Sequence, residues 1–89
     1  MNAIITVVGS DKVGIVAKVT SFLSEHSANI IDITQSILSG NFVMMLMVNL
    51  DKADLTIDCF RDKMLELGKQ IGVEINVMNE AVFSAMHRV

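Results

Sequence analysis

The stretch Gly9-Ser10-Asp11-Lys12-Val13-Gly14-Ile15-Val16 decides the fold, because it joins a strand-like segment to a helix-like one. Residues 3–8 before it are β-branched and almost continuously apolar, which is typical of a strand buried on both faces. After it, apolar residues recur at helical spacing and predict a helix that ends near His26. The stretch is therefore a loop that ends at a helix N-terminus, where unpaired N–H groups and the helix dipole favour an anion.

Two further strands are predicted to follow this helix as a hairpin. Residues 30–38 alternate in polarity, and Ser39-Gly40-Asn41 supplies the glycine and asparagine that a positive φ requires. Residues 42–50 then return as an antiparallel partner that is apolar on both faces, so something must cover each face. In 30–38, the residues expected on the dry face are Ile31, Ile33 and Ile37, and those expected on the wet face are Asp32, Thr34 and Ser36.

A second helix and a fourth strand complete the pattern. Asp51 and Asp54 are the candidate N-caps of this helix, and Gly72 is expected to end it in the left-handed conformation. Residues 73–79 alternate as a strand, and the tail 80–89 has the spacing of a short docked helix. The apolar stripe of the second helix consists of Ile57, Phe60, Met64, Leu67 and Ile71.

The order of elements predicts an α+β fold in a single domain over residues 1–89. Right-handed crossovers turn a βαββαβ order into a ferredoxin-like sandwich, a four-stranded antiparallel sheet with two helices on one face, here followed by a short C-terminal helix. In this topology the strands 3–8 and 42–50 are the central pair, and they are the two that are apolar on both faces. A second copy of the chain is expected to bury the apolar surface that remains.

Composition narrows the classes of function. The chain is 52% hydrophobic and 19% charged, which favours a homodimer or a larger homo-oligomer. A net charge of −3 with scattered basic residues disfavours nucleic acid as a partner, and no apolar run is long enough for a membrane span. The single Cys59 cannot form an internal disulfide, so we expect a cytoplasmic protein without a redox role.

No residue pattern predicts a metal, a cofactor or a catalytic centre. Met44 falls on one face of its strand and Met45 and Met47 on the other, so packing is favoured over a soft-metal site. His26 and His87 are predicted at helix C-termini, where the dipole favours an imidazolium, and neither has a partner at a metal-ligand spacing.

With these residues in view, the chain resembles the ACT domain family of amino-acid-binding regulatory modules. The matching features are Gly9-x-Asp11-x-x-Gly14-Ile15-Val16, the Asn29-Ile30-x-Asp32 entry to the second strand, and the βαββαβ order. The resemblance covers essentially the whole chain and is strongest to small stand-alone ACT proteins of the UPF0237 kind. Where the family often has a glycine near the end of the first helix, this chain has Ser27.

The resemblance implies a dimer that encloses a free amino acid between the first loop of one chain and the start of the second strand of its neighbour. The N–H groups of Gly14, Ile15 and Val16 would bind the carboxylate, and Asp11 with Asn29 would accept from the ammonium group. Gly9 and Gly14 would leave clearance for the ligand. Each residue also has a structural interpretation. Asp11 is a natural helix N-cap, Gly9 and Gly14 suit turn geometry, Asn29 suits backbone hydrogen bonding, and Asp32 suits a solvated surface.

Other functions on this topology fit the residues less well. An acylphosphatase-like enzyme needs an arginine in its phosphate loop, and the first arginine here is Arg61. RNA recognition needs aromatic side chains on the central strands, where only Phe42 occurs, and a copper chaperone needs paired cysteines in the first loop. The alternative that stays open is a pure interaction module, which acts through a partner enzyme or a transcriptional regulator.

Overall fold

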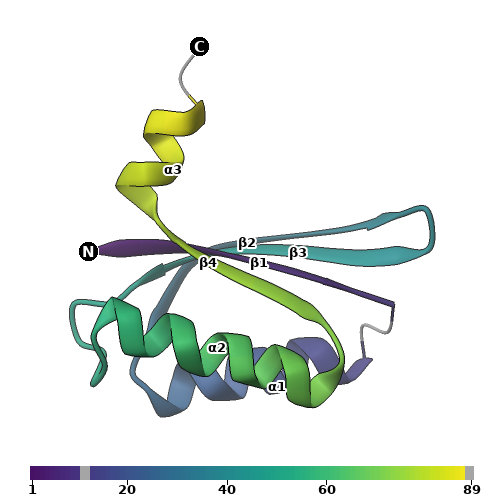
Figure 1. The fold of residues 1–89 in the computed structure, drawn as a ribbon, viewed down its shortest axis with the longest axis horizontal. Coiled ribbons are helices and arrows are strands. Elements are labelled where there is room, and N and C mark those ends of the chain that lie inside the picture. The colour runs from purple at the N-terminus through teal and green to yellow at the C-terminus, as the bar shows by residue number, and fades with distance from the viewer. Residues whose placement is uncertain (11–12, 88–89) are drawn as a thin grey trace.

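The computed structural model describes residues 1–10 and 13–87, and all of their side chains except those of Val13, Phe83, Met86 and His87. Four strands form one antiparallel sheet in the order β2-β3-β1-β4. Two helices, α1 and α2, lie on one face of this sheet (Figure 1). The elements are β1 (Asn2–Gly9), α1 (Val13–Glu25), β2 (Asn29–Leu38), β3 (Asn41–Asn49), α2 (Ile57–Ile71), β4 (Glu74–Asn79) and α3 (Glu80–His87). The predicted ferredoxin-like fold with a short C-terminal helix is confirmed.

The hydrophobic core lies between the sheet and the two helices. Ile5 of β1 and Leu46 of β3 are opposite each other in the sheet and are both fully buried on the helical face. From the helices, Val19 and Leu23 of α1 and Phe60 of α2 close the core from the other side. The alternating burial of β3 confirms its predicted inner face, which consists of Phe42, Met44, Leu46, Val48 and Leu50.

Four described residues with positive φ mark the turns and the helix ends. Ser39 and Gly40 have φ values of 51° and 79°, so they form a two-residue hairpin turn of the I′ kind, and Asn41 already belongs to β3. Gly72 has a φ of 72° and ends α2, as predicted. Ser27 has a φ of 57° after α1, where the Ala28 N–H donates to the Leu23 carbonyl at 2.9 Å. Ser27 therefore takes the left-handed position that a glycine fills at many helix ends.

The predicted caps of α2 are wrong. The N-cap is Thr56, whose hydroxyl accepts from the Cys59 N–H at 3.3 Å. The two aspartates have other partners, because Asp51 pairs with the ammonium group of Met1 and Asp54 bonds the ring of His26. The pKa of Asp51 lies below its ordinary value because this carboxylate accepts hydrogen bonds from the Met1 ammonium group and from Asn49.

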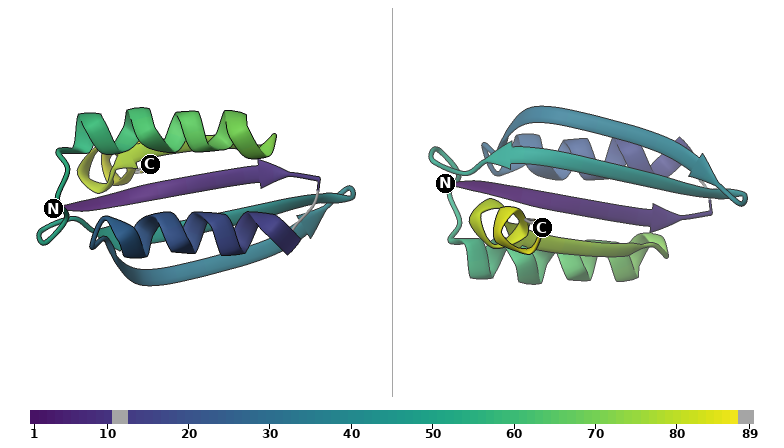
Figure 2. Two further views of the ribbon diagram at one scale, coloured as in Figure 1. Left: turned by 90° about the horizontal axis from the view of Figure 1, so that it is seen from below. Right: turned by 90° about the horizontal axis from the view of Figure 1, so that it is seen from above.

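Strand β2 differs from the prediction of one dry face. Ile33 and Ile37 do lie on the helical face, opposite Leu46 and Phe42, but both are exposed, as is Ile31 at a bulge in the strand. The reason is that β2 is an edge strand that the helices do not cover, as the view from below shows (Figure 2). A bulge between Ile30 and Asp32 shifts the register of β2 by one residue. Asp32 therefore pairs with Met47 and lies on the face away from the helices, as predicted.

Helix α3 forms where the sequence predicts a helix, but it is not laid on the sheet. It stands almost upright on the face away from α1 and α2, and it is seen end-on from above (Figures 1 and 2). Strand β4 runs directly into α3, with the Asn79 side chain accepting from the Ala81 N–H at 2.8 Å. Because no turn separates the two elements, the helix does not fold back onto the strands.

Candidate functional site

The loop between β1 and α1 contains the first group of predicted site residues. Gly9 ends β1, and Gly14, Ile15 and Val16 belong to the first turn of α1. Asp11 lies outside the described residues, so its predicted roles as a cap and as a ligand contact stay predictions. Ile15 is 3% exposed and is a core residue, so only its backbone is available to a ligand.

Gly9 is in close contact with the core. A Cβ at this position would lie 2.5 Å from Cγ1 of Val73 and 2.9 Å from Cδ1 of Ile15, both shorter than real carbon contacts. The absence of a side chain at Gly9 is therefore required by the packing of β1 against α1 and against Val73, which lies between α2 and β4.

Gly14, unlike Gly9, has open space where a side chain would be. It is exposed, and a Cβ there would meet no described atom within 4 Å. The residue borders two hollows, one of about 550 Å³ between α1 and α2 and one of about 270 Å³ that also touches Ile71. A side chain at Gly14 would project into free space beside the first turn of α1.

The first turn of α1 is electrostatically suited to an anion. The first N–H groups of any α-helix have no partner within the helix, and the dipole makes this end positive. The first turn of α1 contains no acidic residue, whereas α2 has Asp58 and α3 has Glu80 in the same position. Within the helix, nothing acidic therefore neutralises the positive end of α1.

Asn29 lies at the other end of the sheet from this turn. It is exposed at the start of β2, opposite Asn49, which in turn pairs with Asn2 at the start of β1. Gly9, in contrast, pairs with Phe42 at the far end of β3. Seven residue steps along β1 correspond to about 24 Å. Asn29 and the first turn of α1 in one chain are therefore too far apart to hold one small ligand.

The groove between the helices was not predicted from the sequence. Its floor includes Phe22 and Leu67, both half-buried, and its rim carries Lys18, Glu25 and Gln70. A sequence signal exists in the small residues Gly14, Ala17 and Ser21, which recur at helical spacing and leave room beside α1. The distance between α1 and α2 is set by the sheet below them, so the pattern alone did not reveal the groove.

Outside the first turn of α1, the described side chains do not form a second candidate site of three kinds, namely a histidine centre, a metal site or a membrane span. Nδ1 of His26 lies 2.9 Å from Oδ1 of Asp54, and the His26 ring packs on Phe22 at a centroid distance of 4.6 Å. Cys59 is a free and exposed thiol. Among the side chains that the structure describes, no three His, Cys, Asp or Glu residues gather as a metal site requires. Within the same residues, no helix has the length and hydropathy that a bilayer crossing needs.

Comparison with known proteins agrees with this fold and identifies the family that shares it. The family model that matches is described as an ACT domain, and it covers residues 2–78. The UPF0237 protein YjhC of Lactococcus lactis is 47% identical over 89 residues, a match that spans 100% of both chains.

Two solved structures carry the same arrangement of elements. An ACT domain protein from Streptococcus pneumoniae superposes with a TM-score of 0.84 at 41% identity, over 93% of each chain. A formyltetrahydrofolate deformylase from Pseudomonas syringae superposes with a TM-score of 0.78 at 25% identity, over 86% of this chain and 26% of the deformylase. The same unit thus exists as a small protein and as one part of a larger chain.

Proposed function

The chain belongs to the ACT domain family of regulatory, ligand-binding modules, and we propose that it binds a free amino acid or a related small carboxylate between two copies of itself. The observation that carries this proposal is the separation of Asn29 from the first turn of α1 within one chain. Both were expected to contact one ligand, and two copies are needed to bring them together.

The chemistry of the two ends is complementary to a zwitterion. The N–H groups of Gly14, Ile15 and Val16 provide donors for a carboxylate at the positive end of α1. The amide oxygen of Asn29 and the carboxylate of Asp11 provide acceptors for an ammonium group. The open space at Gly14 leaves room for the ligand to approach the backbone. Gly9 supports this site by allowing β1 to pack closely beneath the first turn of α1.

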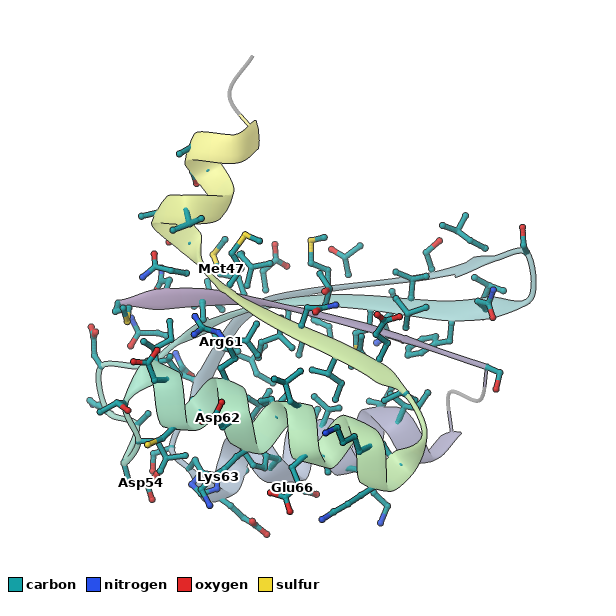
Figure 3. The ribbon with its side chains drawn as sticks, in the orientation of Figure 1. Met47, Asp54, Arg61, Asp62, Lys63 and Glu66 are labelled. Carbon is teal, nitrogen blue, oxygen red and sulfur yellow. The ribbon has the colours of Figure 1, made fainter. Side chains whose placement is uncertain are left out.

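The two edges of the sheet differ in a way that favours pairing through β2. On β4, the edge is covered by α2, and Nε of Arg61 donates to the Val77 carbonyl at 3.3 Å; Figure 3 shows Arg61 between α2 and the sheet. On β2, ten residues form an uncovered edge with exposed isoleucines. A long uncovered edge strand is a template for another chain.

Antiparallel pairing of two β2 strands across a two-fold axis has a direct consequence for the site. The start of β2 in one copy then lies beside the end of β2 in the other. That end is where Ile37 pairs with Phe42, and Phe42 pairs with Gly9. Asn29 of one copy is thereby brought to the end of the sheet at which α1 of the second copy begins.

The flank of α1 that faces this edge is suited to contact with a second copy. Val16, Thr20 and Ser24 follow one another at four-residue spacing on the flank away from the groove, and none is charged. The hydroxyl of Thr20 donates to the Val16 carbonyl at 2.7 Å, so this donor does not require water. Two such flanks can approach closely without burying an unpaired charge.

A ligand-dependent thermal shift tests the proposal. A ligand of roughly ten heavy atoms is expected to bind in the micromolar to millimolar range, and at a hundredfold excess over its Kd it adds about 2.7 kcal/mol of stability. We expect at least one common amino acid to raise the Tm of the protein. Gly14→Leu should abolish the shift and leave the dimer intact, because the added side chain would crowd the first-turn N–H groups from the side of the groove, away from the flank of α1 that is proposed to meet the second copy.

Ala17→Leu is the matched control, since Ala17 is exposed one turn further along α1. It adds the same kind of side chain away from the first-turn N–H groups, so the ligand shift should persist. If no amino acid raises the Tm, or if both variants lose the shift equally, ligand binding at the first turn is wrong.

The second candidate is a pure interaction module that acts through a partner enzyme or a transcriptional regulator. The deformylase comparison favours it, since there a unit of this fold occupies about a quarter of a larger chain. A protein that dimerises but responds to no ligand would support this alternative. Under either candidate we infer a cytoplasmic protein without catalytic activity and without nucleic acid as a partner.

A further inference from the structure

We propose that the groove between α1 and α2 is a docking site for one helix of a partner protein. The docking helix carries an acidic and a basic residue two turns apart, with apolar residues between them. The groove runs between the two helices on their outer side, as the view from below shows (Figure 2). It takes a segment of another protein, whereas the first turn of α1 is proposed to take a small ligand.

The groove is continuous along both helices. Its central hollow of about 550 Å³ shares Gly14, Lys18 and Gln70 with a hollow of about 270 Å³ at the start of α1. It also shares Glu25 and Leu67 with a hollow of about 220 Å³ at the end of α1. Eleven residue steps from Gly14 to Glu25 correspond to about 16 Å along the helix axis. A partner helix of about three turns therefore fits along the groove.

The floor of the groove is apolar and is held in place by the residues beneath and beside it. Phe22 and Leu67 are half-buried there, so each leaves part of its side chain open to a partner. The Phe22 ring packs on the Phe60 ring at a centroid distance of 5.7 Å and on the His26 ring at 4.6 Å. His26 is in turn held by Asp54. An apolar surface that is already ordered loses little side-chain entropy when a partner binds.

The rim of the groove carries charges of opposite sign at its two ends. Lys18 lies at the end where α1 begins. At the other end, Glu25 and Glu66 outnumber Lys63. Figure 3 shows Lys63 and Glu66 projecting from α2 on the side turned away from the sheet. The ion pairs that the structure describes are formed by other residues, so these four side chains have no described charged partner.

The spacing of these charges matches one face of a helix. Seven residue steps from Lys18 to Glu25 correspond to about 10 Å, which is close to two turns. On a partner helix, residues i and i+7 lie on one face at the same separation, and residues i+3 and i+4 lie between them. An acidic residue at i would meet Lys18, and a basic residue at i+7 would meet Glu25 and Glu66. Apolar residues at i+3 and i+4 would then cover the floor, as in other grooves that bind amphipathic helices.

Other classes of occupant fit the groove less well. A bound small molecule is usually enclosed over most of its surface, whereas no described element covers this groove from outside in Figure 2. Nucleic acid and an anionic membrane would both approach Glu25 and Glu66 with charge of the same sign. A protein helix satisfies both ends of the groove at once.

Two stapled helical peptides test the proposal on the full chain. Both have about three turns and leucines at i+3 and i+4, and the staple is needed because a helix of this length is not stable alone in water. The first peptide has glutamate at i and arginine at i+7, and the second has arginine at both positions. Isothermal titration calorimetry measures the Kd of each, and the wild-type protein should bind the first peptide with a Kd on the order of 1–100 μM.

Lys18→Glu should switch the preference between the two peptides. The variant repels the glutamate and attracts the arginine at that end, so the ratio of the two Kd values should change about tenfold in favour of the second peptide. Lys69→Glu is the matched control, since Lys69 is exposed on α2 and makes the same change of charge without lining the groove. The control should change the ratio by less than about twofold, because solvent and salt screen a charge outside the contact.

Amide chemical shifts locate the peptide on the protein. The first peptide should perturb the signals of Ser21, Phe22, Leu67 and Gln70, which line the groove. Perturbations confined to the sheet, or a Kd ratio that Lys18→Glu leaves unchanged, would overturn the docking site. The absence of binding at about 1 mM peptide would do the same.

Two further results would show that the occupant is wrong. Equal binding by a peptide with the same side chains but a proline-broken helix would mean that the groove takes an extended chain. A lower mass of the Lys18→Glu variant in size-exclusion chromatography with light scattering would mean that a second copy covers the groove. The titrations contain no amino-acid ligand, so their outcome is independent of ligand binding at the first turn of α1.

Discussion

Gly9 packs so closely against Val73 that a methyl group on Gly9 would lie 2.5 Å from the Val73 Cγ1 atom. The contact ties the end of β1 to the residue that precedes β4, and it fixes the position from which the loop to α1 starts. Gly14, five residues later, has no such neighbour among the described atoms. The two glycines of the same loop motif are therefore expected to respond in opposite ways to the same substitution.

Gly9→Ala should lower the free energy of unfolding by about 1–3 kcal/mol, the usual cost of overpacking a core. Gly14→Ala should leave it unchanged or raise it by up to about 1 kcal/mol, because alanine is a better helix former than glycine. Urea denaturation of both variants measures the difference. Equal effects at the two positions would contradict the packing that we describe.

Ser27→Gly should stabilise the protein. Ser27 has a φ of 57°, a conformation that costs a residue with a Cβ more than it costs glycine. We expect a gain of about 1 kcal/mol in the free energy of unfolding, provided that the hydrogen bond from Ala28 to Leu23 is kept. Gly72→Ala is the mirror experiment, since Gly72 ends α2 with a φ of 72°. It should destabilise, and a loss at Ser27→Gly would show that the serine side chain has another role.

Ser39→Asn tests the hairpin between β2 and β3. Both central residues of this turn have positive φ, and Asn-Gly is the preferred pair in such turns. The expected gain in stability is about 0.5 kcal/mol, by the smaller strain of asparagine at positive φ. Ser39→Val serves as the control, because a β-branched residue is strained in this conformation and should destabilise. Thermal denaturation followed by circular dichroism gives both values.

Thr56→Ala removes the side chain that caps α2, and it should cost about 1 kcal/mol of stability. Thr56→Ser keeps the hydroxyl and should retain most of that stability. Asp54→Asn, at the position favoured from the sequence, should leave the cap of α2 unaffected, because the partner of Asp54 is His26. A larger loss for Asp54→Asn than for Thr56→Ala would mean that the capping assignment is wrong.

The sequence predicts most of the fold because the decisive signals are local. The periodicity of 15–23 and 57–71 identifies both large helices, and the turn at 39–40 identifies the hairpin. Thr56 was missed because two aspartates nearby looked like better caps. Asp51 is instead held by Met1 and Asp54 by His26, which are partners far away in the sequence. A capping pattern is local, so it contains no information on distant residues that bind the same aspartate side chains.

The residues of the candidate site stay predictions, and what the structure adds is their positions relative to one another. Gly14 and Asn29 follow from the motif, and their separation by the length of the sheet follows once the strand register is known. Neither the groove between α1 and α2 nor the upright α3 can be read from periodicity, since both depend on how elements are placed relative to one another. The exposure of Ile33 and Ile37 has the same cause, because periodicity does not distinguish an edge strand from a central one.

The difference between the two edges of the sheet limits how many copies of the chain can join by strand addition. Arg61 and α2 cover part of the β4 edge, whereas β2 is the edge with ten residues left open for strand addition. A sheet with one exposed edge strand forms a closed dimer, whereas a sheet with two exposed edge strands can extend into an open filament. If two copies pair through β2 as proposed above, a chain that is 52% hydrophobic is expected to stop at a closed pair and not to grow by strand addition.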